Sequence, residues 1–402
     1  MVHSALIFMS DNDACNRLSI ERNIMRWLVL LVLMVLATGV SAQDSANTPT
    51  LSMFRGDVER TGRFISPPLR SEPSRLWQID LPQPVRTTIA VAHGLAFTGS
   101  EAGALIALDA ATGAEVWSFQ TGDTIVSTPF VDADGALYFG SADRSVYRLD
   151  AQTGELVWSF QTGDEVFSSP VVQDSVVYIG SRDGVLYMLD SETGNVINSY
   201  SVGGEIWSSP ALDAENVYVG SRNGRVAAVN RATGELVWRV SLRGGVDATP
   251  ALDLETGLMF VGDYDGDFHA IRMADGEIVW QTRFADAVYA SAAIGEDMVV
   301  VNDFLGTLVA YEKETGEELW RADIGRIAYS SPSISLDPVS GDETVYALSE
   351  QGGLMYAFDG ATGAELWRVV TGDAGDWRSS TPVIVDGVLY IGSNTDGVIA
   401  FG

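Results

Sequence analysis

Cysteine is nearly absent from this 402-residue sequence: the only one is Cys15, which precedes the apolar stretch that begins at Trp27. Beyond that stretch no disulfide can form, and no thiol can act as a nucleophile or metal ligand. Histidine is also scarce. His93 and His269 lie far apart, with no G-x-S-x-G segment near either. A Ser-His-Asp site is therefore not expected, and both histidines are interpreted as structural.

Lysine occurs once, as Lys313, and the other basic residues are arginines. Lysine and arginine together number 24 against 54 acidic residues, which gives a net charge of −30. This charge argues against nucleic acid and anionic membranes as partners, because the long-range force is repulsive. Solubility is the ordinary explanation of such acidity. Adaptation to high salt, where ions screen an acidic surface, is the alternative.

Residues 25–42 have the pattern of a secretory signal peptide. Met25-Arg26 forms a short basic region, Trp27–Ala37 is apolar, and Val40-Ser41-Ala42 resembles a cleavage site. A membrane anchor is disfavoured because the apolar run is short for a bilayer. Residues 1–24 are interpreted as an upstream, mis-assigned start and residues 43–71 as an N-terminal linker or arm. Cleavage near Ala42 would place the protein in the periplasm or outside the cell.

A repeated unit of about eleven residues dominates the rest of the chain. Its best copy, RLDAQTGELVW, runs from Arg148 to Trp158, and a divergent copy carries Asn198 at the tryptophan position. The others are ALDAATGAEVW (Ala107–Trp117), MLDSETGNVIN (Met188–Asn198), AVNRATGELVW (Ala228–Trp238), AIRMADGEIVW (Ala270–Trp280), AYEKETGEELW (Ala310–Trp320) and AFDGATGAELW (Ala357–Trp367).

Each copy has the pattern of a strand, a tight turn and a second strand. Asp150 can accept backbone hydrogen bonds in the turn, and Gly154 can adopt a positive φ without a Cβ clash. A tryptophan at one place in nearly every unit is interpreted as a packing device that buries a large ring against the next unit. The predicted docking tryptophans are Trp77, Trp117, Trp158, Trp238, Trp280, Trp320 and Trp367.

The spacing of this position predicts the fold. Successive steps are 41, 40, 40, 42, 40 and 47 residues, and stepping back 40 residues from Trp117 reaches Trp77. A period of about 40 residues with four short strands is typical of a β-propeller. We therefore expect an all-β, eight-bladed propeller of four-stranded antiparallel blades over residues 72–402. The strand around Trp77 should close the last blade, which Leu389–Phe401 begins.

The motif carried by Ala107, Asp109, Thr112, Gly113 and Trp117 resembles the tryptophan-docking motif of the pyrroloquinoline quinone (PQQ) family of propellers. The FRGD…RTG segment within residues 53–64 is also similar to members of that family. The resemblance implies a fold of the quinoprotein alcohol dehydrogenase type. It also implies two functional possibilities, a quinoprotein dehydrogenase or a non-catalytic scaffold of the BamB-like branch, which serves outer-membrane β-barrel assembly.

The sequence departs from both kinds. The resemblance implies that a dehydrogenase would cover PQQ with a disulfide of adjacent cysteines and bind calcium through Glu, Asn and Asp, but no cysteine follows the signal. The scaffold is a lipoprotein in the bacteria that use it, and that cysteine is also missing. We expect an exported, non-enzymatic binding module without cofactor. The alternatives are a reduced dehydrogenase that binds PQQ and calcium, and a carbohydrate-binding propeller.

One position per blade predicts where a partner could bind. In propellers the crossover from an outer to an inner strand passes over the channel mouth, and this position lies three residues before the usual proline of the first strand. Aromatic side chains recur there, so the mouth should bind a ligand or a partner segment. The alternative is that the rings only fill the channel. The predicted residues are Arg86, Phe167, Trp207, Asp247, Tyr289, Tyr329, Trp377 and Arg378.

No metal site is expected. Asp263–Asp267 resembles the start of a calcium loop, but Ala274 stands where an EF-hand needs its bidentate glutamate. The same turn in another blade, Ser181–Gly184, is structural. The expected partner is a protein segment or a small ligand at the mouth of a monomer, with no nucleic acid and no integral membrane span.

Overall fold

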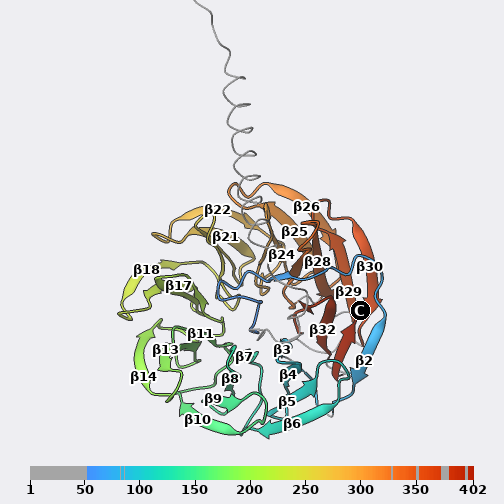
Figure 1. Ribbon diagram of the computed structural model, residues 1–402. Coiled ribbons are helices and arrows are strands. Elements are labelled where there is room, and N and C mark those ends of the chain that lie inside the picture. The colour runs from blue at the N-terminus through green and yellow to red at the C-terminus, as the bar shows by residue number, and fades with distance from the viewer. Residues whose placement is uncertain are drawn as a thin grey trace, which may run out of the picture. The chain divides into compact units, whose positions relative to one another are not determined.

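Thirty-three β-strands make up the described part of the chain in the computed structural model. They form eight sheets arranged in a ring, which we call blades 1 to 8 in chain order (Figure 1). The predicted eight-bladed, all-β fold is therefore confirmed. The structure describes residues 52–81, 83–85, 87–326, 329–349, 353–372, 380–393 and 397–402.

Blades 1 to 4 each run from an inner first strand to an outer fourth strand. Blade 1 contains β3 (Ala90–Ala92), β4 (Leu95–Gly99), β5 (Ala104–Asp109) and β6 (Glu115–Gln120). Blade 2 contains β7 (Phe130–Val131), β8 (Ala136–Ser141), β9 (Ser145–Asp150) and β10 (Leu156–Gln161). Blade 3 contains β11 (Val171–Gln173), β12 (Val176–Gly180), β13 (Val185–Asp190) and β14 (Val196–Ser201). Blade 4 contains β15 (Ala211–Leu212), β16 (Asn216–Gly220), β17 (Arg225–Asn230) and β18 (Leu236–Ser241).

Blades 5 to 8 follow the same order, and the N-terminal segment adds one strand to blade 7 and one to blade 8. Blade 5 contains β19 (Ala251–Asp253), β20 (Leu258–Gly262), β21 (Asp267–Arg272) and β22 (Ile278–Arg283). Blade 6 contains β23 (Ala293–Ile294), β24 (Met298–Asn302), β25 (Thr307–Glu312) and β26 (Glu318–Asp323). Blade 7 contains β27 (Ser333–Leu336), β28 (Glu343–Ser349), β29 (Leu354–Asp359) and β30 (Glu365–Val370), plus β1 (Arg63–Ile65). Blade 8 contains β31 (Val383–Val385), β32 (Val388–Ser393), β33 (Gly397–Phe401) and β2 (Arg75–Ile79).

The two ends of the chain meet in blade 8, as the spacing of the repeats predicts. Strand β2 pairs antiparallel with β33, and Trp77 lies opposite Ala400. The N-terminal strand thus supplies the outer strand that the C-terminal part of the chain lacks. Because this pairing closes the ring, no blade is left with a missing strand.

The recurring tryptophans pack between neighbouring blades. Trp158 of blade 2 is buried, and its indole N–H donates to the carbonyl of Ser191 in blade 3 at 2.9 Å. The turn glycine beneath it, Gly194, has a φ of 70°, and a Cβ added there would lie 2.8 Å from the indole. The glycine is therefore required twice, for its backbone conformation and for the close approach of the ring. The other indole N–H groups donate in the same way to Ala110 (from Trp77), Ala151 (Trp117), Met273 (Trp238), Lys313 (Trp280) and Gly360 (Trp320).

Two blade junctions differ from this pattern. Between blades 3 and 4, Asn198 replaces the tryptophan, and its amide donates to the carbonyl of Thr233 at 2.6 Å. Between blades 7 and 8 there is no Thr-Gly turn to receive Trp367, and its indole donates instead to Leu69 at 2.7 Å. The N-terminal segment therefore replaces the missing turn at the junction where the ring closes.

Residues 52–66, which we call the arm, lie inside the propeller and not beside it. The sequence predicts a linker or arm over residues 43–71, and residues 52–66 of it belong to the same compact unit as the blades. The arm crosses the centre of the ring in Figure 1 (blue). Its carbonyl oxygens at Val58, Glu59, Thr61 and Gly62 accept from first-strand N–H groups of four successive blades. Those donors are Leu212, Leu252, Ile294 and Ile334.

The arm is hydrogen-bonded to the remaining four blades as well. Ser52 accepts from Val91 of blade 1 and pairs with Val131 of blade 2. Arg60 donates to the carbonyl of Pro170 in blade 3, and Ser66 accepts from Gly387 of blade 8. One short segment is thus bonded to every blade, which stabilises the ring against opening.

Two arginines of the arm are fully buried in the channel. Arg60 donates to the carbonyls of Pro170 at 2.8 Å and Pro210 at 2.9 Å, and Arg55 donates to Pro332 at 2.6 Å and to Ala292. Both have a positive φ, of 66° at Arg55 and 62° at Arg60. Burial lowers the pKa of each guanidinium to about 9. These side chains satisfy carbonyls just before the first strands of blades 3, 4, 6 and 7, which water would otherwise have to reach.

Candidate functional site

The crossovers and the inner hairpins of the blades gather at one end of the channel, which we call the mouth. Each crossover leads into a first strand that runs away from the mouth. The arm bonds near the far ends of these strands, for example at Val131 and Leu212, which are the last residues of β7 and β15. The channel is therefore open at the mouth and occupied by the arm at the opposite end.

A cavity of about 740 Å³ opens at the mouth. This volume lies in the range typical of ligand pockets, about 300–1,000 Å³. Phe54 of the arm also lines the cavity. Five of the residues predicted for the mouth line it: Phe167, Trp207, Asp247, Tyr289 and Tyr329. The other three, Arg86, Trp377 and Arg378, lie outside the described residues.

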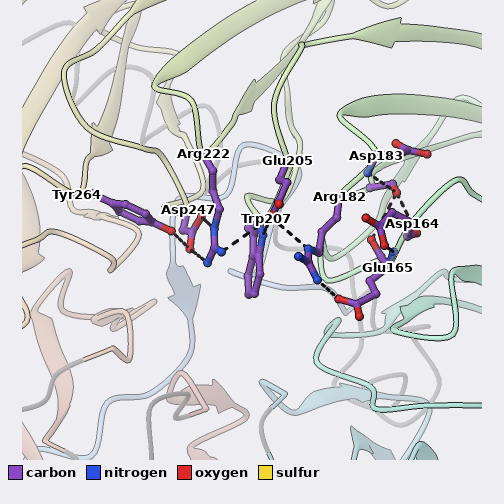
Figure 2. Close-up of polar contacts among 10 residues, drawn as sticks. Asp164, Glu165, Arg182, Asp183, Glu205, Trp207, Arg222, Asp247 and Tyr264 are labelled. Atoms are coloured by element: carbon purple, nitrogen blue, oxygen red, sulfur yellow. Dashed lines mark hydrogen bonds and ion pairs between the residues drawn. The ribbon is translucent and has the colours of Figure 1, made fainter.

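A chain of alternating charges runs along one side of the mouth, from blade 3 to blade 5 (Figure 2). Arg182 lies between Glu165, to which it donates, and Glu205, at 3.2 Å. Arg222 lies between Glu205, at 3.9 Å, and Asp247, which it binds through two nitrogens at 2.9 and 2.7 Å. We call these five residues the charge ladder. The bidentate contact of Arg222 with Asp247 gives this end of the ladder a defined geometry.

The charge ladder holds Trp207 in place. The indole N–H donates to Glu205 at 3.0 Å, and the guanidinium carbon of Arg222 lies 3.4 Å from the centre of the ring system. Arg182 lies on the same ring at 5.4 Å. Hydrogen bonds from Trp207 and Arg182 lower the pKa of Glu205, so its carboxylate stays ionised. The tryptophan is thereby oriented by both cation–π and hydrogen-bonding contacts.

Aromatic rings continue the wall of the cavity beyond the ladder. Tyr264 donates its hydroxyl to Asp247, and its ring lies 5.1 Å from Tyr289. Tyr289 in turn lies 5.0 Å from Tyr329, and Phe304 lies 4.8 Å from Tyr329. Burial and the charge of Asp247 raise the pKa of Tyr264, so its phenol remains neutral. We call Tyr264, Tyr289, Phe304 and Tyr329 the aromatic wall.

A belt of hydroxyl groups encircles the cavity below the mouth. The backbone N–H at one belt position donates to the hydroxyl of the equivalent residue in the next blade, as from Ser169 to Ser209 at 2.9 Å. Seven such bonds are present among the described residues. The belt fixes the spacing of the blades around the cavity. Its members are Thr88, Thr128, Ser169, Ser209, Thr249, Ser291, Ser331 and Thr381.

Four further residues at the mouth are not among those predicted from the sequence: Arg182, Arg222, Tyr264 and Phe304. Each follows the buried residue that opens the turn between the second and third strands, namely Ser181, Ser221, Asp263 and Asp303. The sequence predicts only a structural role for that turn, as at Ser181–Gly184. The second residue of this turn, compared from blade to blade, is the signal in the sequence that identifies this second set of side chains at the mouth.

The aspartate-rich turn of blade 5 has a structural role. Asp263 is buried, accepts from the N–H groups of Asp265 and Asp267 at 3.0 Å each, and lies 3.3 Å from His269. Hydrogen bonds of this kind are what a turn carboxylate supplies. Among the described residues, no group of three or more His, Cys, Asp or Glu side chains is placed to hold a metal ion.

The ring of eight blades and the docked indoles define a PQQ-like propeller. The chain belongs to the family described as outer membrane protein assembly factor BamB, whose sequence profile matches residues 71–226 and 222–402. The predicted membership of the BamB-like branch is thus confirmed. No curated protein matches the chain significantly.

Solved structures share the fold at low sequence identity. BamB from Moraxella catarrhalis is 20% identical with a TM-score of 0.68, and the match covers 82% of this chain and 99% of that one. The computationally designed protein Ika8 is 16% identical with a TM-score of 0.69, covering 81% and 99%. Quinohemoprotein alcohol dehydrogenase from Comamonas testosteroni is 15% identical with a TM-score of 0.71, covering 90% and 81%. Scaffold and dehydrogenase therefore share this architecture, and function has to be argued from the site.

Proposed function

We propose that the protein is an exported, non-enzymatic binding module of the cell envelope, which holds a segment of a protein partner in the mouth cavity. The observation that carries the proposal is the cavity itself, with Trp207 and the aromatic wall on its sides and the arm at its far end. Half-buried aromatic side chains held in fixed orientations are typical anchors of protein interfaces. The family description, an assembly factor for outer membrane proteins, supports a role at the envelope.

The charge ladder supports binding over catalysis. A general base must be free to take a proton, but both oxygens of Asp247 are bonded to Arg222 and Tyr264 also donates to it. Glu205 is bonded to Arg182 and Trp207. These groups shape and orient a surface. They do not form a constellation of acid, base and nucleophile.

The predicted signal peptide, residues 25–42, lies outside the described residues, and export remains part of the proposal. Within the described part of the chain, the structure contains no helix that could span a bilayer. Fractionation of cells that express the full chain tests the predicted cellular location. Recovery of a shortened protein, with an N-terminus near Gln43, from the periplasm or the medium is the expected result. A full-length protein in the cytoplasm would contradict it.

Affinity capture from envelope extract tests the binding role. The wild-type protein should retain a defined partner, and Trp207→Ala should lose it, because the indole is a central anchor of the mouth. Leu254→Ala is the matched control, since Leu254 is an exposed apolar residue in the loop after β19, away from the mouth. Equal capture by the wild type and both variants would refute a partner site at the mouth.

The alternative is a reduced quinoprotein dehydrogenase. The described residues do not favour its calcium, because they contain no group of three or more His, Cys, Asp or Glu side chains placed to hold a metal ion, and the carboxylates of the ladder are already paired with arginine. Purified protein with added PQQ and calcium, followed by tryptophan fluorescence and dye-linked oxidation of alcohols and sugars, separates the two functions. Saturable PQQ binding with turnover would show that the protein is a dehydrogenase and not a scaffold. A glycan array tests the carbohydrate-binding alternative in the same way.

A further inference from the structure

The described charges at the mouth do not balance. The ladder contains three carboxylates, Glu165, Glu205 and Asp247, but only two guanidiniums, Arg182 and Arg222. Each guanidinium lies between two of these carboxylates, so its charge is already compensated. An anionic ligand would therefore meet more negative than positive charge along the ladder, whereas a cation would be attracted.

The aromatic wall also favours a cation over an anion. The faces of tyrosine and phenylalanine rings carry negative electrostatic potential and attract cations that lie over them. Tyr289 and Tyr329 line the cavity next to the Asp247 end of the ladder. Within the ladder, Arg222 already uses this chemistry by stacking on Trp207 at 3.4 Å. A second guanidinium or ammonium over Tyr289 would repeat that arrangement two blades further on.

The net charge of the whole protein also favours a cationic partner. Its net charge of −30 draws cationic partners toward it and accelerates their encounter, an effect that salt weakens. The cavity of about 740 Å³ admits more than one side chain. A loop or a terminal segment of a protein can therefore enter, whereas a folded surface element such as a helix face would stay at the rim.

We propose that the mouth recognises a cationic segment of its partner, with an arginine or lysine side chain inserted between the Asp247 end of the charge ladder and the faces of Tyr289 and Tyr329. This inference rests on the proposed function and names the chemistry of the partner. The arginine or lysine would continue the alternation of charges that Glu165, Arg182, Glu205, Arg222 and Asp247 begin.

Three capped pentapeptides of the form Gly-X-Gly-X-Gly, with X as arginine, norleucine or glutamate, test the proposal. The exported protein, with its N-terminus near Gln43, is titrated with each peptide by calorimetry at low salt. The arginine peptide should bind saturably and about tenfold or more tightly than the other two, and its affinity should fall as salt is added. Tighter or equal binding of the glutamate or norleucine peptide would overturn the proposal. So would the absence of arginine-peptide binding at millimolar concentration.

Two variants locate the binding. Asp247→Asn removes the charge at the end of the ladder and keeps the size of the side chain. Tyr289→Leu removes the aromatic face without changing any charge, so it remains informative if Asp247→Asn perturbs Arg222. Both should weaken the arginine peptide about fivefold or more, in line with a cation–π or paired-charge contact. Glu235→Gln, which removes one exposed charge at the other end of blade 4, should leave the affinity unchanged.

The outcomes also separate this inference from the proposed function. If Trp207→Ala abolishes capture of the partner while the glutamate peptide competes for the site as well as the arginine peptide does, the scaffold role stands and cation recognition is wrong. If the arginine peptide binds and no partner is retained in a manner that depends on Trp207, the mouth is a cation-selective pocket without the scaffold role. Equal loss of arginine-peptide affinity in Glu235→Gln and Asp247→Asn would attribute binding to overall charge and refute the site.

Discussion

The packing of each indole on a turn glycine predicts a difference between two identical substitutions. Gly194 and Gly234 occupy the same turn position in blades 3 and 4, and both have a φ of 70°. Over Gly194 lies Trp158, buried and bonded to Ser191, whereas over Gly234 lies the amide of Asn198. Gly194→Ala and Gly234→Ala therefore carry the same backbone strain but meet different neighbours.

The magnitudes follow from the structure. An alanine in the left-handed region costs about 1–2 kcal/mol at either position. At position 194 the new Cβ would lie 2.8 Å from an indole that cannot move without losing its hydrogen bond, and overpacking of this kind costs about 1–3 kcal/mol more. At position 234 the obstacle is the end of the Asn198 side chain, which can rotate away because its hydrogen bond to Thr233 is exposed and water can replace it. Gly194→Ala should thus lose about 2–5 kcal/mol and Gly234→Ala about 1–2 kcal/mol.

Urea denaturation followed by circular dichroism measures both variants against the wild type at the same protein concentration. The expected result is a clearly lower midpoint for Gly194→Ala than for Gly234→Ala, with similar slopes. Equal losses would show that backbone conformation alone explains the glycines. In that case the close approach of the indoles would contribute nothing to the stability of the ring.

Three further predictions test other parts of the structure. Asn198→Trp should raise the free energy of unfolding by about 1–2 kcal/mol, because an indole can dock on Gly234 as in the other blades, and a midpoint below that of the wild type would contradict this. Lys313→Met should lower the free energy of unfolding by about 3–5 kcal/mol, because it leaves the buried carboxylate of Asp253, 3.0 Å from the lysine, without its partner charge. Replacing Asp253 by Leu in the same chain should restore much of this stability. If it restores none, the explanation is wrong. Burial raises the pKa of Glu343, so ionisation of this side chain lowers stability as pH rises from below its unfolded pKa. Glu343→Gln should therefore unfold at a higher temperature than the wild type at pH 7.5 and at an equal temperature at pH 3.5, and a pH-independent difference would argue against this cause.

The ring of blades could be predicted because its determinants repeat. The tryptophan position returns about every 40 residues, so the number of blades follows from the spacing, and Trp77 marks the closing strand although no full repeat surrounds it. The same regularity located Trp207 and Tyr289, since both occupy one position relative to the first strand. Each of these inferences needs only the period of the sequence and the preference of a large ring for burial.

The parts that could not be predicted occur once or depend on contacts between blades. Nothing in the composition of the arm shows that Arg55 and Arg60 are fully buried, because charged side chains are rarely buried and the segment matches no repeat. The pairing of Arg222 with Asp247 joins residues 25 positions apart in a turn and a crossover, and the sequence gives no register between those loops. Lys313 stands out in the sequence only as the single lysine, and its burial beside Asp253 depends on the packing of blades 5 and 6.

Site-specific photocrosslinking tests the central claim, that the mouth cavity is where the protein binds its partner. A photoreactive phenylalanine analogue is placed at Tyr289 or Phe167 inside the cavity, and at Leu254 as the control outside it. Irradiation of intact cells should join the same envelope protein to positions 289 and 167 and not to position 254. Crosslinks that form from position 254 and from neither cavity position would show that the partner binds elsewhere on the propeller.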